Sequence, residues 1–174
     1  MQNLDSRKAV IAIFFASLAL LAVLLVVLGR WLDGWLPLPA LGLGAVNPVM
    51  SALLSLAGAG LVTWSVYVQY AIGKGTPAPR VATQRLVVEG PYAYSRNPMT
   101  LGALLFYLGI GIGMSSLSAI VMVLLVFAGL LTYIYFHETQ ELEGRFGAAY
   151  LDYKRRTPFL LPCPHLKFSR GRSF

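Results

Sequence analysis

Residues 98–136 read PMTLGALLFYLGIGIGMSSLSAIVMVLLVFAGLLTYIYF and contain no Asp, Glu, Lys or Arg. Two apolar runs, 98–113 and 117–136, make up this segment, and only residues 114–116 separate them. Because an α-helix rises about 1.5 Å per residue, a run of about 20 apolar residues crosses a hydrocarbon core of about 30 Å. The pattern therefore predicts a tight hairpin of two membrane-spanning helices.

Two further apolar runs lie upstream of this hairpin. Residues 9–29 form an uncharged run of 21 residues. A cleavable signal peptide is the alternative, but its apolar region is shorter and no small-residue cleavage site follows here. Prolines break the start of the next apolar region, which places a second span at 48–70 and leaves 38–47 as an interfacial or re-entrant piece. The sequence thus predicts an all-α integral membrane protein with about four transmembrane helices, forming one membrane domain over residues 1–174.

The composition agrees with burial in lipid. Hydrophobic residues make up 57% of the chain and charged residues 12%, with a mean hydropathy of +0.67, whereas soluble domains carry about 25% charged residues. The net charge of +7 would also suit a nucleic-acid-binding protein. However, the basic residues cluster between the apolar runs, which is the arrangement that orients a membrane protein and attracts anionic lipids. The predicted partner is therefore the membrane and not nucleic acid.

Metal-binding residue types are sparse. The single cysteine, Cys163, excludes an intramolecular disulfide, and His137 and His165 lie too far apart for metal-ligand spacing. No metal site is predicted.

Thirteen of the 14 Lys and Arg residues fall on one side of a four-span arrangement. They are Arg7 and Lys8, four residues of the loop 73–97 and seven residues of the segment 137–174, and only Arg30 lies on the other side. The positive-inside rule then predicts that both termini and this loop are cytoplasmic. Since the spans lack the Asp, Glu, Lys and Arg residues that transporters and proton pumps use, we expect function at the cytoplasmic ends of the helices.

The loop before the third span carries two motifs, GKGTPAP at 73–79 and GPYAYSRNPM at 90–99. Within the second motif, Asn97 is suited to cap the following helix and Pro98 to begin it. On spacing alone, the loop is equally well interpreted as a rigid connector in which Arg96 binds lipid phosphates.

The segment after the fourth span, residues 137–153, reads HETQELEGRFGAAYLDY. It carries a stripe at spacings of four, four and three residues, formed by Leu142, Phe146, Tyr150 and Tyr153. This stripe predicts a cytoplasmic helix that continues out of the fourth span. An amphipathic helix that only packs against the bundle is the alternative, and residues 158–174 are expected to form an irregular basic tail.

Together these motifs resemble the signature of the isoprenylcysteine carboxyl methyltransferase and phosphatidylethanolamine methyltransferase group. Bacterial members of that group carry GxGTPxP, then GPYxYxRNPM, then EExxLxxxFGxxYxxY, and the third motif corresponds to ETQELEGRFGAAYLDY at 138–153. The resemblance covers roughly residues 48–162. Two positions depart from the pattern: Thr139 replaces the second Glu, and Thr100 replaces a common aromatic residue.

The resemblance implies a methyltransferase that uses S-adenosylmethionine and acts on a lipophilic or membrane-embedded acceptor, such as an isoprenylcysteine carboxylate or a phospholipid amine. It implies a prokaryotic membrane and no protein partner. Arg96 and Glu138 are the candidate catalytic residues. Arg96 would anchor a carboxylate or phosphate of the cofactor or of the substrate. Glu138 and His137 would bind polar parts of the cofactor, and either could act as a base. The candidate cofactor-binding set is Tyr92, Tyr94, Asn97, Pro98, Met99, Gly102, His137, Glu138, Tyr150 and Tyr153.

Two other classes of function compete with this interpretation. An NADPH-dependent membrane reductase of the sterol reductase type would resemble the chain in its C-terminal helices and its Arg-containing loop. Such reductases have more spans, and they carry Arg-His-Pro-Asn-Tyr where this chain has RNPM at 96–99. A non-catalytic relative is the second alternative, and Thr139 is the residue that favours it.

Overall fold

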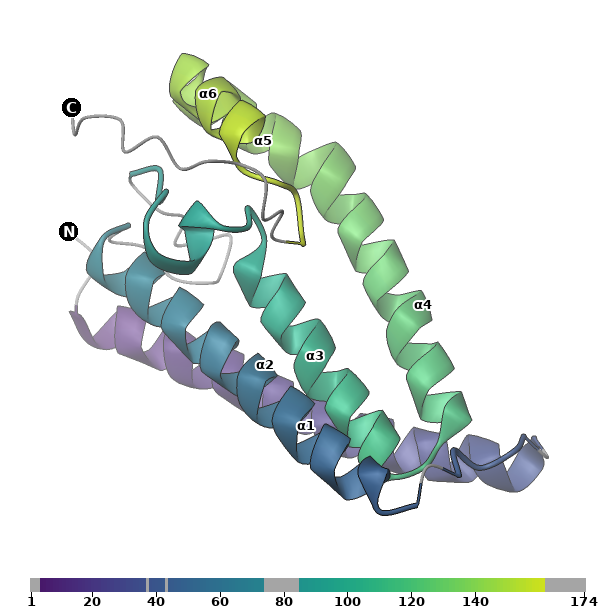
Figure 1. The fold of residues 1–174 in the computed structure, drawn as a ribbon. Coiled ribbons are helices and arrows are strands. Elements are labelled where there is room, and N and C mark those ends of the chain that lie inside the picture. Colours follow the sequence, from purple (N-terminus) through teal and green to yellow (C-terminus); the bar gives the residue numbers. More distant parts are fainter. Residues whose placement is uncertain (1–3, 37, 43, 74–84, 162–174) are drawn as a thin grey trace.

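The structure is a computed structural model that describes residues 4–36, 38–42, 44–73 and 85–161. These residues form helices and the segments that connect them (Figure 1), which confirms the predicted all-α fold. The elements are α1 Leu4–Trp35, α2 Val46–Ala71, the 3₁₀ helix η2 Gly90–Ala93, α3 Pro98–Gly113, α4 Leu117–Tyr133, the π-helical turn η3 Ile134–Glu138, α5 Thr139–Phe146 and α6 Ala148–Arg156.

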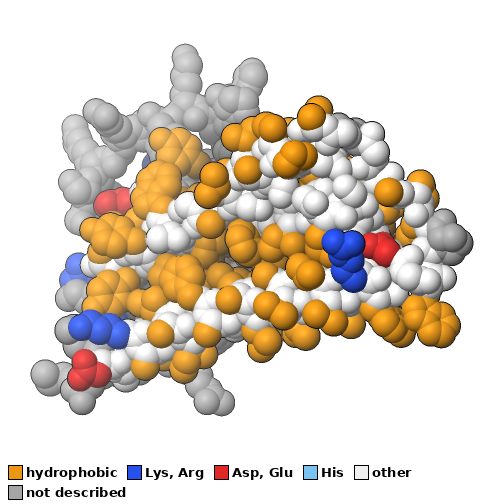
Figure 2. All heavy atoms as spheres, turned by 90° about the horizontal axis from the view of Figure 1, so that it is seen from below, with side chains coloured by type: hydrophobic (Ala, Val, Ile, Leu, Met, Phe, Trp, Pro, Cys, Tyr) orange, Lys and Arg blue, Asp and Glu red, His pale blue; other side chains and the backbone are white. Residues whose placement is uncertain are grey.

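Three helical segments in the described part of the chain are long and apolar enough to cross a membrane: Asp5–Trp35, Val46–Ala71 and Leu117–Phe146. The apolar helix α3 has 16 residues, so it extends about 24 Å and is shorter than a hydrocarbon core of about 30 Å. Figure 2 shows a surface dominated by hydrophobic side chains, with the few charged ones toward its two ends. The chain is therefore an integral membrane protein, and its described part contains three helices long enough to span a membrane and the shorter apolar helix α3.

Helices α2 and α3 form the tightest pair in the bundle, because glycines line their contact. A Cβ atom on Gly58 would overlap the backbone of Phe106, and one on Gly102 would lie 2.8 Å from the carbonyl oxygen of Gly58. At Gly109, a Cβ would lie 2.8 Å from the backbone nitrogen of Ser55. Small residues let two helix backbones approach closely within a membrane. This packing fixes the position of α3, and hence of the loop that precedes it.

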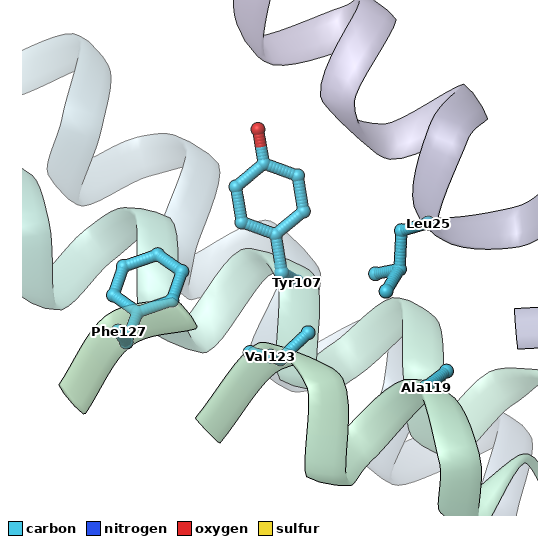
Figure 3. Close-up of a cluster of buried hydrophobic side chains, with 5 residues drawn as sticks. All are labelled: Leu25, Tyr107, Ala119, Val123 and Phe127. Atoms are coloured by element: carbon cyan, nitrogen blue, oxygen red, sulfur yellow. The ribbon is translucent and has the colours of Figure 1, made fainter. Parts of the chain in front are cut away.

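Helices α1, α3 and α4 meet in a separate apolar core (Figure 3), whose buried residues are Leu25, Tyr107, Ala119, Val123 and Phe127. The Tyr107 ring lies 6.1 Å from the Phe127 ring, and the Tyr107 hydroxyl donates a hydrogen bond of 2.9 Å to the carbonyl oxygen of Leu18. This bond satisfies a polar group in an apolar region, where an unpaired hydroxyl would be costly. It also fixes the position of α1 along the bundle.

Residues 114–116 form the turn between α3 and α4, and we call this end of the bundle the hairpin end. Ser116 caps α4 by accepting a hydrogen bond of 3.0 Å from the Ala119 backbone N–H. Asn47 donates from Nδ2 to Ser115 Oγ at 2.6 Å and to the Leu41 carbonyl oxygen at 2.7 Å. The described part of the expected 38–47 piece is therefore a connector that packs on this turn, with α2 beginning at its end.

The opposite end of the bundle, where α2 ends and α3 begins, is called the loop end. Figure 1 shows α3 and α4 close together at the hairpin end and apart at the loop end. The diverging end of α4 leads into η3, α5 and α6.

The C-terminal segment is not the single continuous helix that the sequence predicts. Helix α4 passes into the π-helical turn η3, and a break at Gly147 separates α5 from α6. Gly147 has a φ of 53°, a left-handed conformation that glycine adopts without steric penalty. The break redirects α6, so that its tyrosines reach the loop before α3.

Candidate functional site

The 3₁₀ helix η2 is held against α2 by the Tyr92 ring. Tyr92 is 7% exposed and packs in a small core with Val68 and Val87. Gly90 begins η2 with a φ of 60°, and a Cβ there would lie only 3.0 Å from the Val68 side chain. Glycine thus allows both the left-handed turn and the close approach to α2.

The loop and the C-terminal segment meet at the loop end of the bundle. The Tyr153 hydroxyl donates a hydrogen bond of 2.7 Å to the Tyr92 carbonyl oxygen. Asn97 Nδ2 donates to the Phe159 carbonyl oxygen at 2.9 Å, and the Arg96 backbone N–H donates to the Pro158 carbonyl oxygen at 2.9 Å. Two segments separated by the α3–α4 hairpin therefore fold back onto each other.

Arg96 lies at the centre of this junction. Its Nη1 atom is 3.4 Å from the Tyr150 hydroxyl, and its guanidinium carbon lies 5.4 Å from the centre of the Phe159 ring. Its Nε atom is buried and has no hydrogen-bond partner among the described residues. A buried donor without a partner costs about 1–3 kcal/mol. The guanidinium therefore has unused hydrogen-bonding capacity at this junction.

His137 and Glu138 end the π-helical turn η3 and lie on the other side of the junction. The His137 ring stacks 5.0 Å from the Tyr133 ring. The Glu138 charge is close enough to Tyr92 to affect its ionisation. Both side chains are accessible to solvent, as groups that contact a diffusing ligand must be.

Two tyrosine hydroxyls at the junction are kept neutral by their surroundings. Burial raises the pKa of Tyr92, its neighbours Tyr153 and Glu138 raise it further, and a side-chain hydrogen bond with Gln69 opposes the rise. Burial also raises the pKa of Tyr153, and Arg96 opposes this effect. Both phenols therefore stay protonated at neutral pH and act by hydrogen bonding, not as bases.

Against this geometry, the sequence model of the phospholipid methyltransferase family matches residues 46–149, which is more than half of the chain. The chain belongs to the phospholipid methyltransferase family. Comparison with curated proteins and with solved structures gives no match. The matched region includes the loop with Arg96 and the π-helical turn with Glu138. The family assignment thus confirms the resemblance to membrane methyltransferases.

Thr139 stands where the signature of this membrane methyltransferase group carries its second Glu. It is 6% exposed, and its Oγ1 donates a hydrogen bond of 3.2 Å to the carbonyl oxygen of Ile134, which also accepts the Thr139 backbone N–H. Both bonds span five residues and close the π-helical turn. In this family member, Thr139 therefore has a structural contact that orients His137 and Glu138.

We expect Thr139→Val to destabilise the protein by about 0.5–1.5 kcal/mol, because valine keeps the shape but removes the hydroxyl donor to Ile134. Thr139→Ser keeps the hydroxyl and is the matched control. Thermal unfolding in detergent, followed by circular dichroism, measures the difference. Equal melting temperatures for the valine and serine variants would show that the side-chain bond does not support the turn.

The remaining predicted site residues differ in their exposure and in their contacts. Tyr94 is 57% exposed, whereas Pro98 is fully buried at the first turn of α3. Met99 is half-buried beside it. Gly102 faces α2, where its lack of a side chain is required for packing against Gly58. Asn97 occupies the N-cap position of α3, but its side chain does not cap the helix as expected, because it bonds to Phe159 instead.

Some residues at the junction are not among the site residues that the sequence predicts. Pro158 and Phe159 join the site through their carbonyl oxygens, although the sequence reads as the start of an irregular tail. Gln69 lies near Tyr92, and its only signal is that it is an amide within an apolar run. Residues 74–79 of the GKGTPAP motif and residues 162–174 of the tail lie outside the described residues.

Proposed function

We propose that the chain is an S-adenosylmethionine-dependent methyltransferase that methylates a lipophilic or membrane-embedded acceptor at the cytoplasmic face of the membrane. The family assignment supports a membrane methyltransferase. The observation that carries the proposal is the junction between the loop and the C-terminal segment, where Arg96, Glu138 and several aromatic rings come together. Bound S-adenosylmethionine would supply a methyl group activated by its sulfonium.

The residues at the junction fit the chemistry of this methyl donor. Its carboxylate needs a cation, and the Arg96 Nε atom is a buried donor without a described partner. Its ammonium needs an anion, and Glu138 supplies one at the accessible side of the junction. A sulfonium is attracted to aromatic faces, and Tyr150 and Tyr153 lie with ring centres 6.1 Å apart. Positioning of this kind can lower the barrier of a displacement reaction by several kcal/mol.

The place of the junction fits an acceptor that is dissolved in lipid. It lies at the loop end, directly beyond the apolar helices α2, α3 and α4, so a soluble cofactor and a membrane-bound acceptor can both reach it. The distribution of Lys and Arg supports a cytoplasmic position for this end.

The role of a base depends on the acceptor. A lipid amine must be neutral to attack the methyl group, and His137 or Glu138 could accept its proton. An isoprenylcysteine carboxylate is already anionic and requires no base. A pH profile of turnover with each acceptor therefore separates the two classes.

The test uses purified protein in nanodiscs, S-adenosylmethionine labelled in its methyl group, and a total lipid extract. We expect label in the lipid fraction. Glu138→Gln should weaken cofactor binding roughly tenfold or more, because a hydrogen bond to a charged group contributes about 1.5–3 kcal/mol. Glu141→Gln is the matched control, since Glu141 is exposed and, among the described residues, pairs with Arg145 at 3.5 Å on α5. Binding of a nicotinamide nucleotide in place of S-adenosylmethionine, with no label transferred, would overturn the proposal.

A further inference from the structure

The Phe159 ring contacts both elements that carry the candidate catalytic residues. It lies against the guanidinium of Arg96, whose central carbon is 5.4 Å from the ring centre. It also meets the Tyr135 ring in an edge-to-face contact, with 5.7 Å between the ring centres and 82° between the planes. Arg96 belongs to the loop before α3, and Tyr135 belongs to η3, the turn that also carries Glu138. One side chain therefore connects the two halves of the candidate site.

The backbone around Phe159 is fixed to the loop independently of the ring. After α6 the chain returns to the start of α3 (Figure 1), where the Pro158 carbonyl oxygen accepts the Arg96 backbone N–H at 2.9 Å. The Phe159 carbonyl oxygen accepts Asn97 Nδ2, also at 2.9 Å. Neither bond uses the Phe159 side chain. A substitution that removes the ring therefore leaves both bonds available, and the effect of the ring can be measured separately from the path of the chain.

Few other contacts fix the direction of the Arg96 guanidinium. Its Nη1 atom is 3.4 Å from the Tyr150 hydroxyl, which is longer than the usual N–H···O distance of about 2.7–3.2 Å. Among the described residues, no carboxylate forms an ion pair with it. A guanidinium is attracted to an aromatic face, and a long side chain without such restraints samples many rotamers. The Phe159 ring is therefore the main restraint on this cation.

We propose that Phe159 is a positioning residue, which sets the orientation of the Arg96 guanidinium relative to η3 in the methyl-transfer site. The inference rests on the proposed function, since it concerns how a group of that site is held and not which reaction takes place. The region that matches the family model ends at residue 149, so Phe159 lies beyond it. The segment that follows α6 thereby becomes a part of the site.

Substitutions at Phe159 separate the aromatic ring from its bulk. Phe159→Leu removes the aromatic face and keeps an apolar side chain, whereas Phe159→Tyr keeps the ring and should behave as the wild-type protein. Phe159→Met replaces the leucine variant if that variant does not fold, because methionine adapts to irregular space. Phe146→Leu is the matched control: Phe146 is also half-buried, and its ring centre lies 5.2 Å from the guanidinium carbon of Arg145. All variants are full-length proteins in nanodiscs, and thermal unfolding shows that they are folded.

The first measurement is the rate at which phenylglyoxal modifies each arginine in the absence of any ligand, followed by mass spectrometry. Loss of the ring releases the guanidinium, so Phe159→Leu should raise the rate at Arg96 about threefold to tenfold. The rate at Arg145 should not change in this variant, and Phe146→Leu should not change the rate at Arg96. An equal rise at both arginines in Phe159→Leu would indicate a loosened fold and would contradict the inference.

The second measurement is the kinetics of methyl transfer, with cofactor and acceptor varied separately. Phe159→Leu should lower kcat/KM about threefold to tenfold and should raise the same KM that Arg96→Ala raises. Combined with Arg96→Ala, it should cause no further loss, because the ring acts through the guanidinium that is then missing. A ring that only supported the fold would give independent losses, which multiply in the double variant.

The inference is overturned if the folded Phe159→Leu variant matches Phe146→Leu in the reactivity of Arg96 or in kcat/KM, or if the losses multiply in the double variant. Failure of the proposed function is a different result. In that case the wild-type protein would transfer no methyl label, while Phe159→Leu would still raise the reactivity of Arg96.

Discussion

Arg96→Ala is expected to lower kcat/KM for methyl transfer about 100-fold or more. The Arg96 backbone is fixed to Pro158 and its guanidinium lies against Phe159 and Tyr150, so the side chain is already in position before a ligand binds. Each charge-assisted hydrogen bond that is lost removes about 1.5–3 kcal/mol, and two such bonds account for the expected loss. Arg96→Lys keeps the positive charge but lacks the planar guanidinium, so its kcat/KM should lie between those of Arg96→Ala and the wild-type protein.

Steady-state kinetics in nanodiscs, with cofactor and acceptor varied separately, measures this effect. A rise in the KM of only one of the two substrates identifies which anion Arg96 binds. Arg156→Ala is the control, because Arg156 is exposed and its pair with Asp152 at 2.9 Å contributes little at a solvated surface. Wild-type kinetics for Arg96→Ala, or an equal loss in both variants, would rule out a specific anion site at Arg96.

Gly58→Ala is expected to give the largest loss of stability. Its new methyl group would overlap the backbone of Phe106 and lie 2.5 Å from the Gly102 carbonyl oxygen, and neither atom can move unless α2 and α3 separate. Overpacking of this kind costs about 1–3 kcal/mol or more. We expect a clear fall in melting temperature, with aggregated protein on size-exclusion chromatography.

Gly60→Ala provides a matched comparison on the same helix. A Cβ at Gly60 meets no atom within 4 Å, and alanine is a better helix former than glycine by about 1 kcal/mol. This variant should therefore be as stable as the wild-type protein or more so. If Gly58→Ala melted at the same temperature as Gly60→Ala, the close contact between α2 and α3 would not be what holds the bundle together.

The helices could be predicted because apolar runs of sufficient length are required to cross a bilayer. The predicted runs 98–113 and 117–136 begin where α3 and α4 begin. By contrast, α1 extends well beyond the predicted run 9–29 at both ends, since hydropathy marks the portion in lipid and not the ends of the helix. The sequence predicts a full span at 98–113, where α3 has only 16 residues, because the apolar pattern does not show where the lipid boundary lies.

The motifs indicate where the candidate site lies, but they do not predict its geometry. The motifs identify Arg96 and Glu138 and place them at one end of the bundle. They do not reveal the π-helical turn, because one extra residue in a turn leaves the apolar pattern almost unchanged. They also miss Phe159, whose contact with Asn97 depends on which elements pack together and not on its sequence neighbours.

The hydrogen bond from Asn97 to Phe159 joins residues that are 62 positions apart. At a synthesis rate of about 5–20 residues per second, Phe159 is made roughly 3–12 s after Asn97. The four apolar helices can therefore enter the bilayer during translation while the last wall of the candidate site is still missing. A nascent chain halted after α4 would be anchored in the membrane without the contacts of Pro158 and Phe159, so the candidate site is complete only after these residues have been made.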